Sequence, residues 1–152
     1  MLKKILIFLV INFTALAIGG FYSGSGVSSD WYESLNKAPW TPPGWVFGAA
    51  WTFIMICFAF FMAYLWNVVK DKKNLIILFG IQWVLNVIWN PIFFSAQEVT
   101  LGLITISLLT VLVGYFFFSN LKKMGLKSLL ISPYLIWLLI ATSLNAYVLF
   151  NN

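Results

Sequence analysis

Trp45 to Val69 reads WVFGAAWTFIMICFAFFMAYLWNVV, a run without a single charged side chain. An α-helix rises about 1.5 Å per residue, so about 20 apolar residues cross a hydrocarbon core about 30 Å thick. The run is long enough to do so. We therefore expect a transmembrane helix here, and the fold depends on how many similar segments accompany it.

Four further stretches are long and apolar enough to span a bilayer. The five expected spans cover residues 5–22, 45–69, 75–94, 100–119 and 129–150. With 62% hydrophobic and 9% charged residues, the chain has too little polar surface for a soluble globule. A β-barrel would alternate apolar and polar residues, whereas these stretches are continuously apolar. The sequence predicts an all-α integral membrane bundle of five transmembrane helices, one domain over residues 1–152.

The basic residues indicate how the bundle is oriented. All nine are lysines, and eight of them fall before the first span or in the second and fourth connections: Lys3, Lys4, Lys70, Lys72, Lys73, Lys122, Lys123 and Lys127. Under the positive-inside rule these segments are cytoplasmic. We expect a multi-pass plasma-membrane protein with a cytoplasmic N-terminus and an outer C-terminus. The small lysine groups form no basic face, so nucleic acid is not an expected partner.

The N-terminus allows a second interpretation. Lys3 and Lys4, the apolar run from Ile5, and an A-x-A pattern at Ala15–Ala17 resemble a cleavable signal peptide. However, the apolar character continues to Tyr22, which is long enough to span the bilayer. We expect a retained helix in which Gly20 and Gly24 allow close packing.

The segment from Trp31 to Trp51, WYESLNKAPWTPPGWVFGAAW, holds four of the eight tryptophans and three prolines. Indole rings offer flat, polarizable faces, and prolines stiffen the backbone. Such a segment suits a flat apolar ligand. We expect residues 23–44 to form a lid over a pocket.

Amide side chains inside the third span need protein partners or a cavity, because unpaired polar groups are costly in lipid. At 100° per residue one face of this helix carries Trp83, Asn86, Asn90 and Phe94, with Trp89 beside it. The amides could instead hydrogen-bond neighbouring helices. Pro91 removes a helical hydrogen bond and is expected to kink the helix, which favours a cavity near Asn90.

Two other spans carry small residues beside large rings. The second span aligns Phe47, Gly48, Trp51 and Met55, and the fifth aligns Tyr134, Trp137, Ala141 and Asn145. The small residues could be ordinary packing contacts. They would also leave space for a flat ligand between the rings.

Three motifs at these positions resemble the TspO/MBR family, the tryptophan-rich sensory proteins related to the mitochondrial translocator protein. They are PWTPPGWVFGAAW at 39–51, W-x-x-N-x-x-W-x-P-x-F-F at 83–94 and P-Y-x-x-W-x-x-x-A-x-x-L-N at 133–145. The resemblance implies a five-helix bundle, usually a homodimer, with a pocket under the first loop. It also implies binding of porphyrins such as protoporphyrin IX, other tetrapyrroles and drugs of the benzodiazepine-receptor type.

Motif positions and the aligned faces together give the candidate ligand-binding residues. They are Tyr22, Trp31, Tyr32, Trp40, Phe47, Gly48, Trp51, Asn86, Trp89, Asn90, Trp137, Ala141 and Asn145. The sterol-recognition pattern of the family needs a base after the apolar residue and tyrosine. Here Leu144 and Tyr147 are followed by VLFNN, which argues against cholesterol transport.

The chain lacks the residues of conventional catalysis. It has no histidine or arginine and four acids, none inside an expected span, so no metal site, Ser-His-Asp triad or histidine-ligated haem is expected. No cofactor is required for the main hypothesis, which is tetrapyrrole binding. Trp51 and Trp137 would be photochemical residues if bound porphyrin is degraded by light and oxygen. Export of porphyrins or other apolar compounds, and ligand-dependent stress regulation, are the alternatives.

Overall fold

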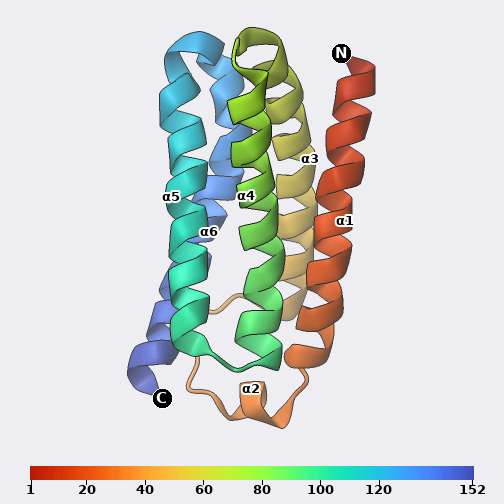
Figure 1. Cartoon of the computed structure of the whole chain (residues 1–152). Helices are drawn as coiled ribbons and strands as arrows, with labels where there is room; N and C mark the ends of the chain where they lie inside the picture. Colours follow the sequence, from red (N-terminus) through yellow and green to blue (C-terminus); the bar gives the residue numbers. More distant parts are fainter.

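Five long helices stand side by side in the computed structural model, which describes residues 1–152 (Figure 1). They are α1 (Leu2–Gly26), α3 (Gly44–Val68), α4 (Lys72–Asn90), α5 (Val99–Met124) and α6 (Ser132–Asn151). No strand is present, and the all-α, five-helix prediction is confirmed. Helices α1 and α5 extend several residues past the predicted spans, since polar residues at their ends continue the helical hydrogen bonding.

Three short elements connect or extend the long helices. They are α2 (Asp30–Ser34) in the first loop, the π-helical turn η1 (Pro91–Ser95) after α4, and the 3-10 helix η2 (Gly125–Ile131) between α5 and α6. The fifth span was predicted to begin at residue 129, but residues 129–131 belong to η2. The chain reverses at Gly125, whose φ of 55° is accessible to glycine.

The helices form a closed ring in the order α1, α3, α6, α5, α4, each packed against its two neighbours. The N-terminus and the α3–α4 and α5–α6 turns lie at one end of the bundle (Figure 1). We call it the lysine end, because it carries the eight clustered lysines. The first loop, the α4–α5 turn and the C-terminus lie at the other end, the loop end.

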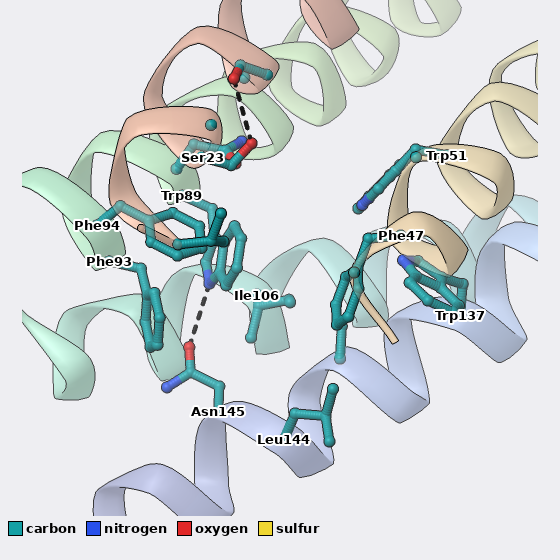
Figure 2. A pocket seen from close by; sticks show the side chains of 18 of the residues that line it. Ser23, Phe47, Trp51, Trp89, Phe93, Phe94, Ile106, Trp137, Leu144 and Asn145 are labelled. Atoms are coloured by element: carbon teal, nitrogen blue, oxygen red, sulfur yellow. Dashed lines mark hydrogen bonds between the residues drawn. The ribbon is translucent and has the colours of Figure 1, made fainter. Parts of the chain in front are cut away.

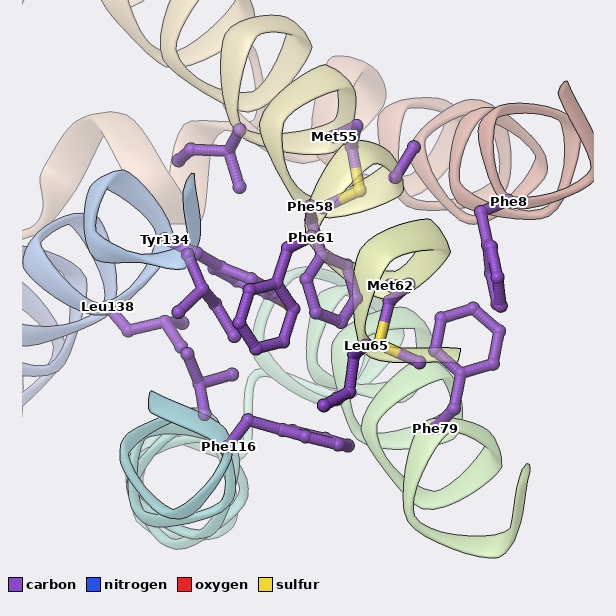
Figure 3. Packing of buried hydrophobic residues seen from close by; sticks show 14 of the residues in the cluster. Phe8, Met55, Phe58, Phe61, Met62, Leu65, Phe79, Phe116, Tyr134 and Leu138 are labelled. Carbon is purple, nitrogen blue, oxygen red and sulfur yellow. The ribbon is translucent and has the colours of Figure 1, made fainter. Parts of the chain in front are cut away.

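The half of the bundle toward the lysine end is filled by an aromatic core (Figure 3). Phe58, Phe61 and Met62 of α3 are fully buried, with Phe116 of α5 beside them. The Phe58 and Phe61 rings are nearly parallel with centroids 6.2 Å apart, and Tyr134 meets Phe58 edge-on at 5.3 Å. These contacts fix α3, α5 and α6 relative to one another.

Helix α1 packs against α3 and α4 as a member of the ring. Asn12 Nδ2 donates to the carbonyl of Met55 at 3.1 Å, and the indole N–H of Trp83 donates to the carbonyl of Ile11 at 3.0 Å. The prediction that Gly20 and Gly24 pack closely is wrong, because a Cβ on either would have no neighbour within 4 Å. Both face the cavity described below.

The outer surface of the bundle is strongly apolar. Val10, Phe21, Phe53, Val111 and Phe118 are each more than half exposed and come from three helices of the ring, α1, α3 and α5. Exposing so many apolar side chains to water is unfavourable, whereas the acyl chains of a bilayer give them an apolar environment. The chain is therefore a multi-pass membrane protein.

Pro91 changes the helix by widening it. After Asn90 the chain enters η1, where the N–H of Ala96 donates to the carbonyl of Pro91 at 2.9 Å, five residues back. Proline has no N–H to donate to the α-helical hydrogen bonds, and the π-turn accommodates the bond that is missing at Pro91. The widened turn carries Phe93 and Phe94 at the loop end.

Candidate functional site

The half of the bundle toward the loop end encloses a cavity of about 620 Å³. Its wall has contributions from all five long helices and from the first loop. Pockets for small organic ligands occupy about 300–1,000 Å³. The cavity is therefore large enough for an organic ligand of substantial size.

Two groups of aromatic rings face each other across the cavity (Figure 2). One consists of Phe47 and Trp51 of α3 with Trp137 of α6, and the Phe47 and Trp137 centroids are 5.4 Å apart and edge-on. The other consists of Trp89 of α4 with Phe93 and Phe94 of η1. The Trp89 and Phe93 rings are stacked, with centroids 5.2 Å apart and an angle of 14° between the planes. We call these groups the α3/α6 wall and the α4/η1 wall.

Ten of the thirteen candidate residues line this one cavity. They are Tyr32, Phe47, Gly48, Trp51, Asn86, Trp89, Asn90, Trp137, Ala141 and Asn145. They come from the first loop and from α3, α4 and α6. Their convergence is a geometric finding, and their contact with a ligand stays a prediction.

Tyr22, Trp31 and Trp40 do not line the cavity. Trp31 lies behind the α4/η1 wall, where its ring meets Phe93 edge-on at 5.6 Å. Tyr22 packs edge-on against Phe21 on α1. The sequence motif placed these rings in the right segments but did not fix the direction of each side chain.

Trp40 attaches the first loop to α6 from outside the cavity. Its indole N–H donates to Ser143 Oγ at 3.1 Å, and its ring meets Tyr147 edge-on at 5.4 Å. A second attachment joins the backbone of Asn36 to the side-chain amide of Asn152, with hydrogen bonds of 2.8 and 3.3 Å. The loop is therefore held across the loop end of the bundle, as a lid would be.

The amide groups at the cavity have different roles. Asn145 is fully engaged, since its Oδ1 accepts from the indole N–H of Trp89 at 3.2 Å and its Nδ2 donates to the carbonyl of Val99 at 3.1 Å. Asn90 Nδ2 donates to the carbonyl of Asn86 at 3.2 Å. The Asn86 amide has no partner within the protein and lies on the cavity wall, so it can bind a polar group of a ligand.

Sequence reasoning missed the contribution of α1 and part of the loop. Gly19, Gly20 and Gly24 give α1 an almost bare surface toward the cavity, and Lys37 also lies on the cavity wall. A Cβ on Gly19 would lie 2.7 Å from Asn90 Nδ2, so any larger residue there would have to displace the Asn90 amide. The glycine spacing in residues 19–26 was the available signal.

Tyr32 is the phenol at the mouth of the cavity. Burial raises the pKa of this side chain above its ordinary value of 10.0, so it stays a neutral hydrogen-bond donor at physiological pH. The Lys37 ammonium lies 4.8 Å from the centre of its ring. The mouth thus combines an aromatic face, a hydroxyl and a cation.

Comparison with known proteins identifies the family of the chain. The model of the TspO/MBR family matches residues 7–150. The chain belongs to the TspO/MBR family. The match includes the lid, both aromatic walls and all five long helices.

Named relatives come from bacteria, archaea and animals. The tryptophan-rich protein TspO of Chlorobaculum tepidum is 32% identical, over 97% of this chain and 96% of its own length. The protein of the same name from Archaeoglobus fulgidus is 32% identical, over 95% and 92% of the two chains. The human translocator protein is 29% identical, over 87% and 79%. These family members are similar to the chain over most of their own length.

Proposed function

We propose that the cavity binds a tetrapyrrole of the protoporphyrin IX type, and that synthetic ligands of the benzodiazepine-receptor type occupy the same space. The observation that carries this proposal is the convergence of Trp51 and Trp137, from different helices, on one slot faced by Trp89. A planar conjugated ring fits between the two aromatic walls. The free amide of Asn86 supplies a polar contact that would orient it.

Apolar burial would provide most of the affinity. At about 25 cal/mol per Å², burying about 300 Å² of ligand surface gives about 7 kcal/mol before the costs of association. The indole N–H of Trp137 adds to this argument, because it is buried and has no acceptor in the protein. A polar atom of a ligand that displaces the neighbouring Phe47 ring would satisfy it.

Light-dependent oxidation of the bound porphyrin is the proposed consequence of binding. A photoexcited porphyrin would take an electron from the electron-rich indole of Trp51 or Trp137 and pass it to O2, which forms superoxide. The indole radical cation would then regain an electron from the macrocycle, which leaves the porphyrin oxidised by one electron. Molecular oxygen, taken from solution, is the terminal oxidant of the macrocycle. The aromatic walls would confine the reactive intermediates.

Titration of the purified protein with protoporphyrin IX in darkness, followed by tryptophan fluorescence, tests binding. Illumination of the same samples then tests degradation. We expect Trp51→Phe and Trp137→Phe to slow porphyrin bleaching, while Trp45→Phe leaves it unchanged because Trp45 is 75% exposed and lies off the cavity wall. Bleaching at the parental rate in both cavity variants would exclude the photochemical step and leave the binding proposal intact.

The same proposal places the lysine end in the cytoplasm and the lid outside. The clustering of eight lysines at one end supports this orientation. Cysteine labelling at Ser28 and at Lys73 with a membrane-impermeant reagent tests it in whole cells. Labelling at Ser28 alone is the expected result.

A further inference from the structure

Lys37 is the only charged side chain on the cavity wall. The other lining residues are apolar, aromatic, hydroxyl or amide side chains and glycines. The remaining eight lysines lie at the lysine end, on the far side of the packed core. A single cation at the mouth of an otherwise uncharged cavity requires an explanation beyond membrane topology.

The ammonium group of Lys37 is held in place without a counter-charge. It donates to the carbonyl of Glu33 at 3.2 Å and contacts the carbonyl of Leu35 at 3.5 Å. The ring of Tyr32 lies beneath it at 4.8 Å. None of these partners carries a charge, so the half-buried ammonium has its positive charge available for an anion.

The surroundings of Lys37 suit a carboxylate. Tyr32 and Thr41 also line this part of the cavity, and the phenol of Tyr32 stays protonated because burial raises its pKa. A phenolic O–H and an ammonium can both donate to carboxylate oxygens. Their position in the lid sets them above the aromatic walls.

The depth of the cavity separates these donors from the tryptophans. Trp51 is seven residues into α3, so it lies about 10 Å below the start of that helix at the loop end. A ligand that fills the slot beside Trp51 and pairs with the charge of Lys37 has an apolar body and an acidic group near the lid. The geometry selects amphipathic acids over uncharged apolar molecules.

We propose that Lys37, assisted by Tyr32, recognises a carboxylate on the ligand and makes the cavity selective for amphipathic acids. This inference rests on the proposed function and names the group of the ligand, a carboxylate, that the lid binds. A tetrapyrrole with propionate side chains has this chemistry, and so does a long-chain fatty acid. Both classes of ligand have an apolar body that carries its carboxylate at one end.

Dark titrations with protoporphyrin IX and with its dimethyl ester separate the carboxylate contact from the ring contact. The variants are Lys37→Met, which keeps the length of the side chain without its charge, Lys37→Arg, and the control Lys73→Met at the lysine end. We expect Lys37→Met to weaken binding of the diacid about fivefold and to leave binding of the ester within about twofold, as for a half-exposed ion pair. Lys37→Arg and Lys73→Met should bind both ligands like the parent.

Salt and competition add two independent measurements. Raising the salt concentration should weaken diacid binding to the parent and have little effect on Lys37→Met. Displacement of the ester by palmitate, lost in Lys37→Met, would show that fatty acids share the contact. If palmitate does not compete while Lys37→Met still weakens protoporphyrin IX binding, Lys37 binds the carboxylates of the tetrapyrrole and not those of fatty acids.

Equal losses of diacid and ester in Lys37→Met would overturn the inference, because a damaged lid would affect both. An unchanged diacid affinity in Lys37→Met would overturn it as well. Both results leave the tetrapyrrole proposal standing. If the parent binds neither porphyrin, the proposed function itself fails, and the inference fails with it.

Discussion

The two halves of the bundle use the same kinds of side chain for opposite purposes. Toward the lysine end, Phe58 and Phe61 are buried among other rings (Figure 3). Toward the loop end, Phe47 and Trp51 of the same helix face open space (Figure 2). Composition therefore does not decide where a cavity forms. The small residues near the rings decide where it forms, because Gly20, Gly24 and Gly48 have no neighbour where a Cβ would be.

The largest expected effect is the loss of stability when one buried ring is removed from the packed half. Phe58→Ala removes a fully buried ring that contacts several aromatic neighbours. We expect it to destabilise the protein by about 3–5 kcal/mol, measured by thermal unfolding in detergent. Phe53→Ala on the same helix is the control, because Phe53 is 58% exposed to the acyl chains. A similar loss in both variants would show that the ring of Phe58 is not packed in the core as described.

Filling the hollow half should affect binding and leave stability unchanged. Gly48→Leu places a side chain into the cavity, and leucine has a better helix propensity than glycine. We expect protoporphyrin affinity to fall by about 2 kcal/mol or more, as a rough figure for a blocked pocket. Gly80→Leu is the matched control, since Gly80 also has open space but lies off the cavity wall. Unimpaired binding by Gly48→Leu would move the ligand site elsewhere.

Polar contacts in the two halves can be compared through two buried asparagines. Asn145→Ala removes the acceptor of Trp89 and the bond to the start of α5. We expect a loss of about 1–3 kcal/mol in stability together with weaker porphyrin binding. Asn120→Ala in the packed half removes bonds within its own helix, so it should lower stability alone. Equal ligand affinity in the two variants would contradict the positioning role of Asn145.

The smallest expected effect concerns the lid. Asn152→Ala removes the two bonds to the backbone of Asn36, which are exposed and contribute less than about 1 kcal/mol. We expect faster porphyrin association and dissociation in stopped-flow measurements, with little change in affinity. Asn151→Ala is the control, because its amide bonds to Tyr147 of its own helix. Unchanged rates would show that the lid is not held by Asn152.

Apolar runs predicted the helices, and helical spacing together with the sequence motifs predicted ten of the residues that line the cavity. The bilayer sets the length of each span, and motifs on α3, α4 and α6 set the inward faces. Side-chain direction in the first loop was not predictable, because no helical period applies there. Trp40 thus lies outside against α6, whereas Lys37 lies on the cavity wall. The π-turn after Asn90 packs against α1, a contact that spacing alone does not encode.

Helices α5 and α6 are joined by η2 alone, and the direction reverses at Gly125 without any extended loop. The two helices also form one of the most extensive pairings in the ring. During synthesis they are therefore suited to enter the membrane together as a helical hairpin. In the orientation proposed above, Lys122, Lys123 and Lys127 at the bend would remain on the ribosome side, and no charge at the bend would have to cross the hydrocarbon core.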